Sequence, residues 1–266
     1  MPALVLDSPH SGHDFPADFD AIVSERELRE SEDCYVDELY AAAHELGVPL
    51  LAATLPRTYL DPNRNAGDID LDLIEGPWPW EYRPSGKARI GKSLIWRTLE
   101  DGRPIYARKL SPQAVRRRIE RAHTPYHRSL KDKLDAAYKR HGKVYHINCH
   151  SMRCVAGRQS EEGAGSVRPD FVLGDRDGTT CEPRFTGLVR ETLAGMGYDV
   201  KVNDPYKGVE LVRAYSDPKA GRHSVQIEIN KRLYMDEETL QKNANFEKLQ
   251  RDLAELLRVV VNEISD

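Results

Sequence analysis

The stretch Val144–Met152 (Val-Tyr-His-Ile-Asn-Cys-His-Ser-Met) constrains the fold more than any other part of the chain. Apolar and polar residues alternate over Val144–Cys149, and the β-branched residues among them favour a short buried strand. His150 follows this predicted strand directly. Ligands of open α/β sheets bind beyond the carboxyl ends of the strands. The sequence therefore predicts one imidazole at a binding crevice.

A second stretch near the N-terminus has the same design. The apolar run Ala3–Leu6 leads into Asp7-Ser8-Pro9-His10-Ser11-Gly12, so a His-Ser pair again follows a predicted strand. Packing alone does not explain two such pairs, whereas a zinc site built from two imidazoles and one carboxylate does. His10 and His150 are therefore the first two predicted metal ligands.

The composition argues against several kinds of partner. Lys and Arg number 39 against 43 Asp and Glu, a net charge of −4, so there is no basic excess for nucleic acid or an anionic membrane. No apolar run approaches the roughly 20 residues that cross a bilayer, and Asp7 interrupts the first apolar run. A cytoplasmic location is expected. The four cysteines form no C-x-x-C pair and are expected to be reduced thiols.

Strand and helix patterns alternate along the chain and predict a single domain over residues 1–266. Further strands are expected at Val48–Leu55, Phe171–Gly174, Asp199–Val202 and Ser224–Asn230. Helices are expected behind the capping box at 24–27 up to Gly47, after Ser111-Pro112 with an interruption at Pro125, and over Pro183–Met196 and Asp236–Ile264. The order predicts a three-layer α/β/α fold with a mostly parallel, mixed sheet.

Regular periodicity is lost between about residues 56 and 105. Prolines, charged residues and all three tryptophans of the chain gather in this stretch. A long loop-rich segment inside a compact domain is usually functional or disordered, and the tryptophans argue against disorder. We therefore expect a substrate-covering excursion. The later run Arg116-Arg117-Arg118 is expected to lie mostly on the solvated face of a helix.

The third ligand of a catalytic zinc should be a carboxylate at the same crevice, with one position left open. Glu32, Asp33 and Asp37 all come soon after the His10 loop. Asp33 is favoured because helical spacing puts it on the buried side with the apolar residues of Val36–Tyr40. Glu32 and Asp37 remain alternatives.

Glu228 is the candidate general base. It alternates with Ile227 and Ile229 in a predicted strand and so faces the opposite side, together with Gln226 and Asn230. A carboxylate in the middle of a strand is costly unless it is paired or functional. Facing a metal, it would take the proton of a zinc-bound water. The alternative is a surface glutamate on an edge strand.

Asn63-Arg64, after Asp61-Pro62, offers an amide and a guanidinium from one turn. An arginine binds carboxylates through a two-pronged fork, so a small anionic substrate would suit this turn. Further anion-binding candidates, which spacing does not rank, are Arg57, Arg97 and Arg213.

Other catalytic chemistries are less well supported. Three serines accompany the histidines, but the chain has no G-x-S-x-G elbow. Cys149 lies inside a predicted strand, where a reactive thiolate is not expected. A non-catalytic, metal-stabilised binding module remains as a separate alternative.

Six blocks of the sequence, in order, resemble the N-formylglutamate amidohydrolase family. They are Pro9–Gly12, Asp33 with Val36–Tyr40, Asp61–Arg64, Cys149–Met152, Asn203–Gly208 and Gln226–Asn230. The resemblance implies a phosphorylase/hydrolase-like fold related to zinc carboxypeptidases and aspartoacylases, with one zinc per chain. It implies His10, Asp33 and His150 as zinc ligands. Glu228 then corresponds to the general base, and Asn63-Arg64 to the pair that holds a substrate carboxylate.

Two positions depart from the pattern of these families. Carboxypeptidase-like sites carry a Glu three residues after the first His, where this chain has His13. The family often has Asp-Cys-His before the second ligand, where this chain has Asn148. An asparagine there still accepts a hydrogen bond but carries no charge.

The resulting hypothesis is a zinc-dependent amidohydrolase that cleaves a small anionic N-acyl amino acid, N-formyl-L-glutamate for preference, to formate and L-glutamate. Another N-acyl amino acid or a short peptide at the same site is the alternative substrate.

Overall fold

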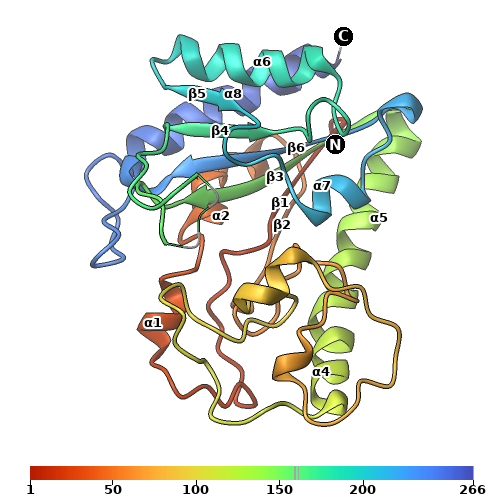
Figure 1. The fold of residues 1–266 in the computed structure, drawn as a ribbon. Helices are drawn as coiled ribbons and strands as arrows, with labels where there is room; N and C mark the ends of the chain where they lie inside the picture. Colours follow the sequence, from red (N-terminus) through yellow and green to blue (C-terminus); the bar gives the residue numbers. More distant parts are fainter. Residues whose placement is uncertain (159, 161, 266) are drawn as a thin grey trace. The chain divides into compact units, whose positions relative to one another are not determined.

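The computed structural model describes residues 1–158, 160 and 162–265, and the chain divides into two compact units (Figure 1). The first unit comprises Met1–Ser8, Tyr35–Ala52 and Leu130–Asp266. The second comprises Pro9–Cys34 and Ala53–Ser129, and it contains the loop-rich stretch expected at about 56–105. The predicted single domain stays a prediction.

Within the described residues, the first unit contains a six-stranded sheet in the order β2-β1-β3-β6-β4-β5. Its strands are β1 (Leu4–Ser8), β2 (Leu50–Ala52), β3 (Val144–Met152), β4 (Phe171–Gly174), β5 (Val200–Val202) and β6 (Arg222–Asn230). Four of them run parallel, whereas β4 is antiparallel to β6 and carries β5 beside it. The predicted mixed, mostly parallel sheet is confirmed.

Strand β3 is longer than the alternation indicated. It pairs with β6 along its whole length, up to Met152 opposite Asn230. His150 therefore lies inside the strand rather than in the loop after it. Strand β6, which carries Glu228, lies between β3 and β4, so the alternative of an edge-strand glutamate is wrong.

Helices cover both faces of the sheet. One face carries α2 (Val36–Leu39), α3 (Ala42–Glu45), α6 (Pro183–Gly195) and α8 (Phe246–Ser265). On this side Tyr145 stacks on Phe185 of α6, with ring centroids 4.5 Å apart. The opposite face carries α7 (Glu210–Ala214) and the C-terminal half of α5 (Thr124–His141). In Figure 1, α6 and α8 lie on one side of the strands and α7 on the other, which confirms the α/β class.

The helix expected up to Gly47 is wrong as a single element. The structure has α1 (Glu25–Arg29), which the predicted capping box opens, and then the separate helices α2 and α3. Tyr35 has a φ of 63°, a left-handed conformation that interrupts a helix. Asp33 lies in the connecting segment, and its N–H donates to the carbonyl of His10 at 3.0 Å. Helical spacing was therefore the wrong reason to favour Asp33.

The last helix also begins later than expected, at Phe246 instead of Asp236. In the segment before this helix, side chains accept hydrogen bonds from the backbone. Asp236 accepts from the N–H of Thr239 at 2.7 Å, and Asn243 accepts from the N–H of Asn245 at 2.9 Å. Such bonds compete with helix formation.

In the second unit, α4 (Pro112–Arg118) begins at the predicted cap Ser111 and continues through the π-helical turn η3 (Ile119–His123) into α5. The N–H of Thr124 donates to the carbonyl of Ile119, and the wider turn accommodates Pro125 without a break. The other short helices of the described residues are η1 (Leu71–Leu73) and η2 (Gly86–Ile90) in the second unit, and η4 (Pro218–Ala220) and η5 (Lys231–Leu233) in the first.

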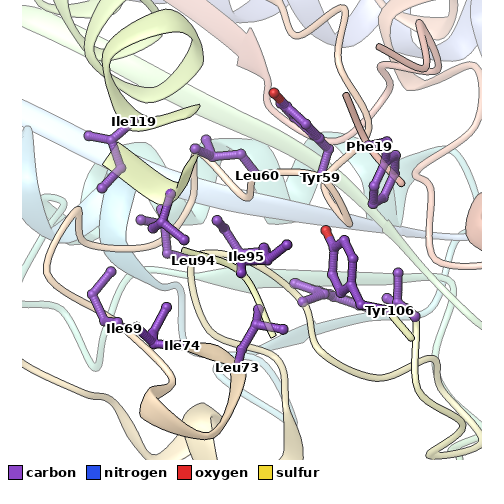
Figure 2. Packing of buried hydrophobic residues seen from close by; sticks show 14 of the residues in the cluster. Phe19, Tyr59, Leu60, Ile69, Leu73, Ile74, Leu94, Ile95, Tyr106 and Ile119 are labelled. Atoms are coloured by element: carbon purple, nitrogen blue, oxygen red, sulfur yellow. The ribbon is translucent and has the colours of Figure 1, made fainter. Parts of the chain in front are cut away.

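The second unit has a hydrophobic core of its own (Figure 2). Its members include Phe19, Tyr59, Leu60, Ile69, Leu73, Ile74, Leu94, Ile95, Tyr106 and Ile119. Arg116 and Arg117 are exposed, as expected for most of the arginine run, whereas Arg118 is buried against this core. Its guanidinium lies 4.0 Å from the ring centroid of Tyr59 and donates to the hydroxyl of Tyr106 at 2.7 Å.

Every helix in the described part of the chain is too short or too polar to span a lipid bilayer.

Candidate functional site

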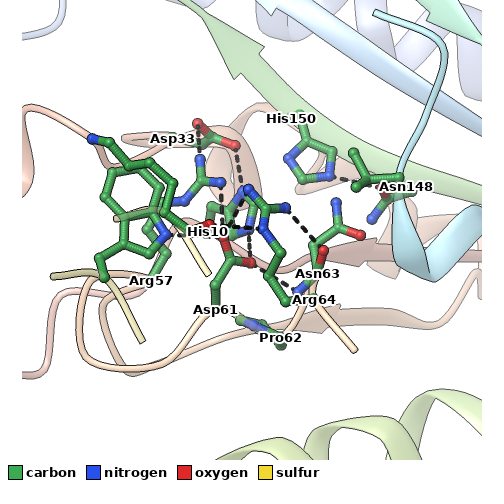
Figure 3. Close-up of polar contacts among 12 residues, drawn as sticks. His10, Asp33, Arg57, Asp61, Pro62, Asn63, Arg64, Asn148 and His150 are labelled. Atoms are coloured by element: carbon green, nitrogen blue, oxygen red, sulfur yellow. Dashed lines mark hydrogen bonds and ion pairs between the residues drawn. The ribbon is translucent and has the colours of Figure 1, made fainter. Parts of the chain in front are cut away.

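The imidazole of His10, in the second unit, contacts two carboxylates. The residue is 2% exposed, and its Nε2 lies 2.7 Å from Oδ1 of Asp61 (Figure 3). Its Nδ1 lies 3.3 Å from Oδ2 of Asp33. An ionised carboxylate only accepts hydrogen bonds, so Nε2–H donates to Asp61. The carboxylate of Asp33 likewise only accepts, so a hydrogen bond to it needs a proton on Nδ1, whereas binding of a metal ion there needs the lone pair of Nδ1.

The turn Asp61–Arg64 follows from its sequence. Pro62 presets the second position of a β-turn, in which the N–H of Arg64 donates to the carbonyl of Asp61 at 3.2 Å. The carboxylate of Asp61 also accepts from the N–H of Asn63 at 2.9 Å, which is an Asx turn. The same side chain therefore shapes the turn and holds His10.

Asp61 is a buried carboxylate among cations. Its Oδ2 accepts from Arg57 at 2.9 Å, and Nη2 of Arg64 lies 3.8 Å away. Burial raises the pKa of Asp61, but the interactions with His10, Arg57 and Arg64 outweigh it and hold the pKa well below its usual range. Asp61 therefore stays ionised and remains an acceptor for His10.

The arginines predicted to bind an anion lie in different surroundings. Arg64 is buried, and it donates to the carbonyls of Lys92 and Asn63, both at 3.1 Å. Arg97 donates to Asp70 at 2.7 Å. Arg213 lies on α7 in the first unit and donates to Glu210 at 2.7 Å. Roles in substrate binding stay predictions for Asn63 and for all three arginines.

His150 in the first unit lies on a polar face of β3. Its Nε2 lies 2.7 Å from Oδ1 of Asn148, two residues earlier on the same face (Figure 3). Across the strands, His150 is paired with Glu228 of β6. Paired residues of neighbouring strands point to the same side of a sheet, so an imidazole and a carboxylate are side by side there.

Glu228 is buried and has a defined orientation. Nε2 of Gln226 donates to Oε1 of Glu228 at 2.8 Å, while the N–H of Val209 donates to Oε1 of Gln226 at 3.3 Å. The backbone bond fixes which end of the amide faces Glu228. The prediction that Gln226 and Glu228 share one face of the strand is confirmed by these contacts.

Cys149, on the other face of β3, is not a candidate nucleophile. Its side chain is fully buried, and burial raises the pKa of the Cys149 thiol well above its usual value. The residue therefore stays a thiol, as its place in the strand predicted.

His10 and Asp33 in the second unit and His150 in the first are each buried, and each offers one atom that could bind a metal ion. The two alternative acids differ. Glu32 accepts from Arg29 at 2.7 Å, and Asp37 lies half-buried in the first turn of α2.

The sequence did not indicate Asp61 as the partner of His10. The two residues are 51 positions apart, and in the sequence Asp61 marks only the start of the turn before Asn63-Arg64. A carboxylate that starts an Asp-Pro turn in a tryptophan-rich segment carries no signal for a distant histidine. Only the folded second unit brings them together.

Comparisons with known proteins agree with the resemblance in the sequence. Residues 2–235 match the profile of a family described as N-formylglutamate amidohydrolase. The N-formylglutamate deformylase of Pseudomonas aeruginosa is 31% identical over 265 residues, which are 98% of this chain and 90% of that protein. The enzyme of the same name from Pseudomonas putida is 30% identical over 88% of this chain and 82% of its own length.

Two solved structures are similar. The crystal structure of an N-formylglutamate amidohydrolase from Ralstonia eutropha is 46% identical, with a TM-score of 0.94 over 99% of this chain and 94% of that one. A gene product of Agrobacterium tumefaciens is 18% identical, with a TM-score of 0.69 over 100% of this chain and 92% of that one, and shares the fold.

Proposed function

Because the chain belongs to the N-formylglutamate amidohydrolase family, we propose that it is a metal-dependent amidohydrolase that releases formate from a small N-formyl amino acid. N-formyl-L-glutamate is the proposed preferred substrate, as in the names of the relatives. The observation that carries the proposal is the pairing of His150 with Glu228, which sets a potential metal ligand beside a buried carboxylate.

The proposed ligands of one zinc ion are His10, Asp33 and His150. Strand β1 runs parallel to β3, with Asp7 opposite Asn148 in the register. The carboxyl ends of β1 and β3 therefore lie at the same end of the sheet. His150 lies near that end of β3, and His10 follows two residues after the last residue of β1. Chain connectivity alone thus supports a shared site for the two imidazoles.

The donor set suits zinc. Two imidazoles and one carboxylate are typical of catalytic zinc sites. Histidines that bind metals usually donate their other ring N–H to an oxygen. Nε2 of His10 has Asp61 as such a partner, and Nε2 of His150 has Asn148. Nδ1 is the proposed ligating atom in both rings.

Zinc supplies Lewis acidity, which polarises a carbonyl and lets water ionise near neutral pH. Glu228 takes the proton of the attacking water as the water oxygen adds to the formyl carbon. The C–N bond then breaks, and Glu228 returns the proton to the leaving nitrogen. The products are formate and the free amino acid, so Glu228 acts first as a base and then as an acid.

Asn63 and Arg64 are proposed to bind a carboxylate of the substrate. The two bonds from Arg64 to backbone carbonyls fix the plane of its guanidinium. A guanidinium has five N–H donors, so a fixed plane still offers donors to a carboxylate. A neutral N-formyl compound is then expected to be a poor substrate.

Glu228→Gln tests the proposed base, because glutamine keeps the size of the side chain but cannot accept a proton. Formate release should fall by about 10²- to 10⁴-fold in kcat, the usual contribution of general acid–base catalysis. Zinc content by elemental analysis should stay at that of the wild type. Glu247→Gln, at an exposed position of α8, is the matched control and should keep full activity.

Full activity of the Glu228→Gln protein would contradict the proposal. Loss of zinc from that variant would make Glu228 a ligand instead of the base.

A further inference from the structure

A chain of buried polar side chains crosses three strands of the first unit. It consists of Asp7 on β1, His146 and Asn148 on β3, and Ser224 on β6, each with no exposed surface. The register explains the arrangement, since Asp7 lies opposite Asn148 and His146 opposite Ser224. The four side chains therefore share one face of the sheet, the face that also carries His150.

The contacts link these residues into one continuous network. Oδ1 of Asp7 lies 2.8 Å from Nε2 of His146 and 2.8 Å from Nδ2 of Asn148. Nδ1 of His146 lies 2.8 Å from Oγ of Ser224. At the other end, Oδ1 of Asn148 lies 2.7 Å from Nε2 of His150.

The chemistry of each group fixes the direction of the bonds that lead from Asp7 through Asn148 to His150. A carboxylate can only accept, so Asn148 must turn its NH₂ group towards Asp7. The amide oxygen of Asn148 then faces His150 and can only accept there. Nε2 of His150 must therefore carry the proton, and the lone pair of the neutral ring belongs to Nδ1.

Stability does not explain such a network. Taking a carboxylate out of water costs several kcal/mol, and apolar side chains of similar volume in the same place are often as stable or more so. The bonds that lead from Asp7 through Asn148 have a defined direction, and they end at the imidazole of His150. A network that fixes one tautomer of one ring gives the buried charge a function.

We propose that Asp7 is a positioning residue, which acts through Asn148 to hold His150 in the Nε2-protonated form with Nδ1 ready to bind the metal. His146 and Ser224 hold Asp7 in place from the other side. The metal-binding consequence rests on the proposed function. The tautomer of His150 is a property of the metal-free protein and does not depend on the proposed function.

The tautomer is measured directly by ring ¹⁵N–¹H spectra of the metal-free, ¹⁵N-labelled protein at mildly alkaline pH, with His150 assigned from a His150→Gln sample. Wild-type His150 should be protonated at Nε2. Asp7→Leu removes the acceptor that orients Asn148, so both tautomers should appear. Zinc affinity, measured by competition with a chelator, should fall by about 10- to 100-fold, as for other groups that orient ligands.

The exchange variant Asp7→Asn with Asn148→Asp separates positioning from mere packing. It keeps one amide and one carboxylate in contact, and a carboxylate at position 148 still only accepts from His150. The Nε2-protonated form and the zinc affinity should both return to wild-type values. A role in packing alone predicts no such rescue.

Asp175→Leu is the control, because it also removes a buried carboxylate from the first unit, where Asp175 accepts from Thr186 and Asn203. It should lower stability and leave the ring of His150 unchanged. Protonation of wild-type His150 at Nδ1 would overturn the proposal even if every variant failed to fold. An Asp7→Leu protein with unchanged tautomer and affinity would overturn it as well. Wild-type protein that binds no zinc would contradict the proposed function instead.

Discussion

His10 and His150 are each held through Nε2 by a side-chain oxygen, Asp61 in one unit and Asn148 in the other. The two holders differ in charge. Asp61 is itself a carboxylate, whereas Asn148 is a neutral amide hydrogen-bonded to the carboxylate of Asp7. Each imidazole is thus linked through Nε2 to a carboxylate. His10 contacts the carboxylate of Asp61 directly, and His150 is linked to that of Asp7 through the amide of Asn148.

Lys92 is a buried cation whose ionisation should control stability in alkaline solution. Its Nζ lies 3.0 Å from Glu100 and 4.0 Å from the ring centroid of Trp96. Burial lowers the pKa of Lys92 from 10.5 to about 8, and Glu100 only partly opposes this. Between those two pH values the unfolded chain binds more protons than the folded one, so the free energy of unfolding rises with pH. This contribution is lost as the pH falls through about 8.

Lys92→Met should remove that pH dependence. The free energy of unfolding of the wild type, relative to the variant, should rise by roughly 3 kcal/mol between about pH 7 and pH 10.5, at about 1.4 kcal/mol per pKa unit. Urea unfolding across this range measures it. Lys109→Met, at an exposed position, is the control and should run parallel to the wild type. Parallel curves for Lys92→Met would contradict the expectation.

The candidate ligands were predictable from the sequence because each histidine follows or ends an apolar run. Their holders were not. Asp7 and His146 are 139 positions apart, and only strand register brings them into contact. Helical spacing favours Asp33 for a helical position that it does not occupy, and its backbone bond to His10 carries no sequence signal. Short-range patterns indicate which side chains point inward, but long-range partners decide what they bind.

The strands were predictable as elements because alternation reflects the two faces of a sheet, and β3 and β6 appear where alternation indicated them. The helix around 24–47 was not. Tyr35 has a left-handed φ within the periodic stretch, and its hydroxyl donates to the carbonyl of Leu240 at 2.9 Å, 205 positions away. Periodicity shows which face of a helix is apolar, and it does not show where the helix is interrupted.

The helical run η3–α5 positions the turn Asp61–Arg64. Nε2 of His123 donates to the carbonyl of Arg64 at 2.9 Å, and Nε2 of His127 donates to that of Pro62 at 2.8 Å. The two rings stack, with centroids 3.9 Å apart. One turn of helix thus holds the segment that is proposed to bind the substrate carboxylate.

His127→Phe should loosen that turn while keeping the stacked ring. The loss of one hydrogen bond should cost about 1 kcal/mol of unfolding free energy. KM for N-formyl-L-glutamate should rise several-fold, with kcat and zinc content near those of the wild type. His141→Phe is the matched control, because His141 makes a similar bond to the carbonyl of Met1 in the first unit. An unchanged KM would show that the helix does not position the binding turn.

At the scale of the whole molecule, family and fold class were predictable because short blocks in a fixed order restrict the topology of an α/β chain. The second unit was harder to foresee. Its core gathers residues such as Ile69, Leu94 and Ile105 from a stretch with neither strand nor helix periodicity. Hydrophobic residues can form a core without a regular pattern when loops and short helices carry them.

The central claim is that His10, Asp33 and His150 bind one metal ion that the deformylation requires. The most direct measurement is formate release from N-formyl-L-glutamate while zinc is titrated into metal-free protein. Activity should be absent without metal, rise in proportion to added zinc and saturate at one equivalent per chain, and His150→Ala protein should stay inactive over that range. Full activity of the metal-free wild type, or of His150→Ala, would contradict the account.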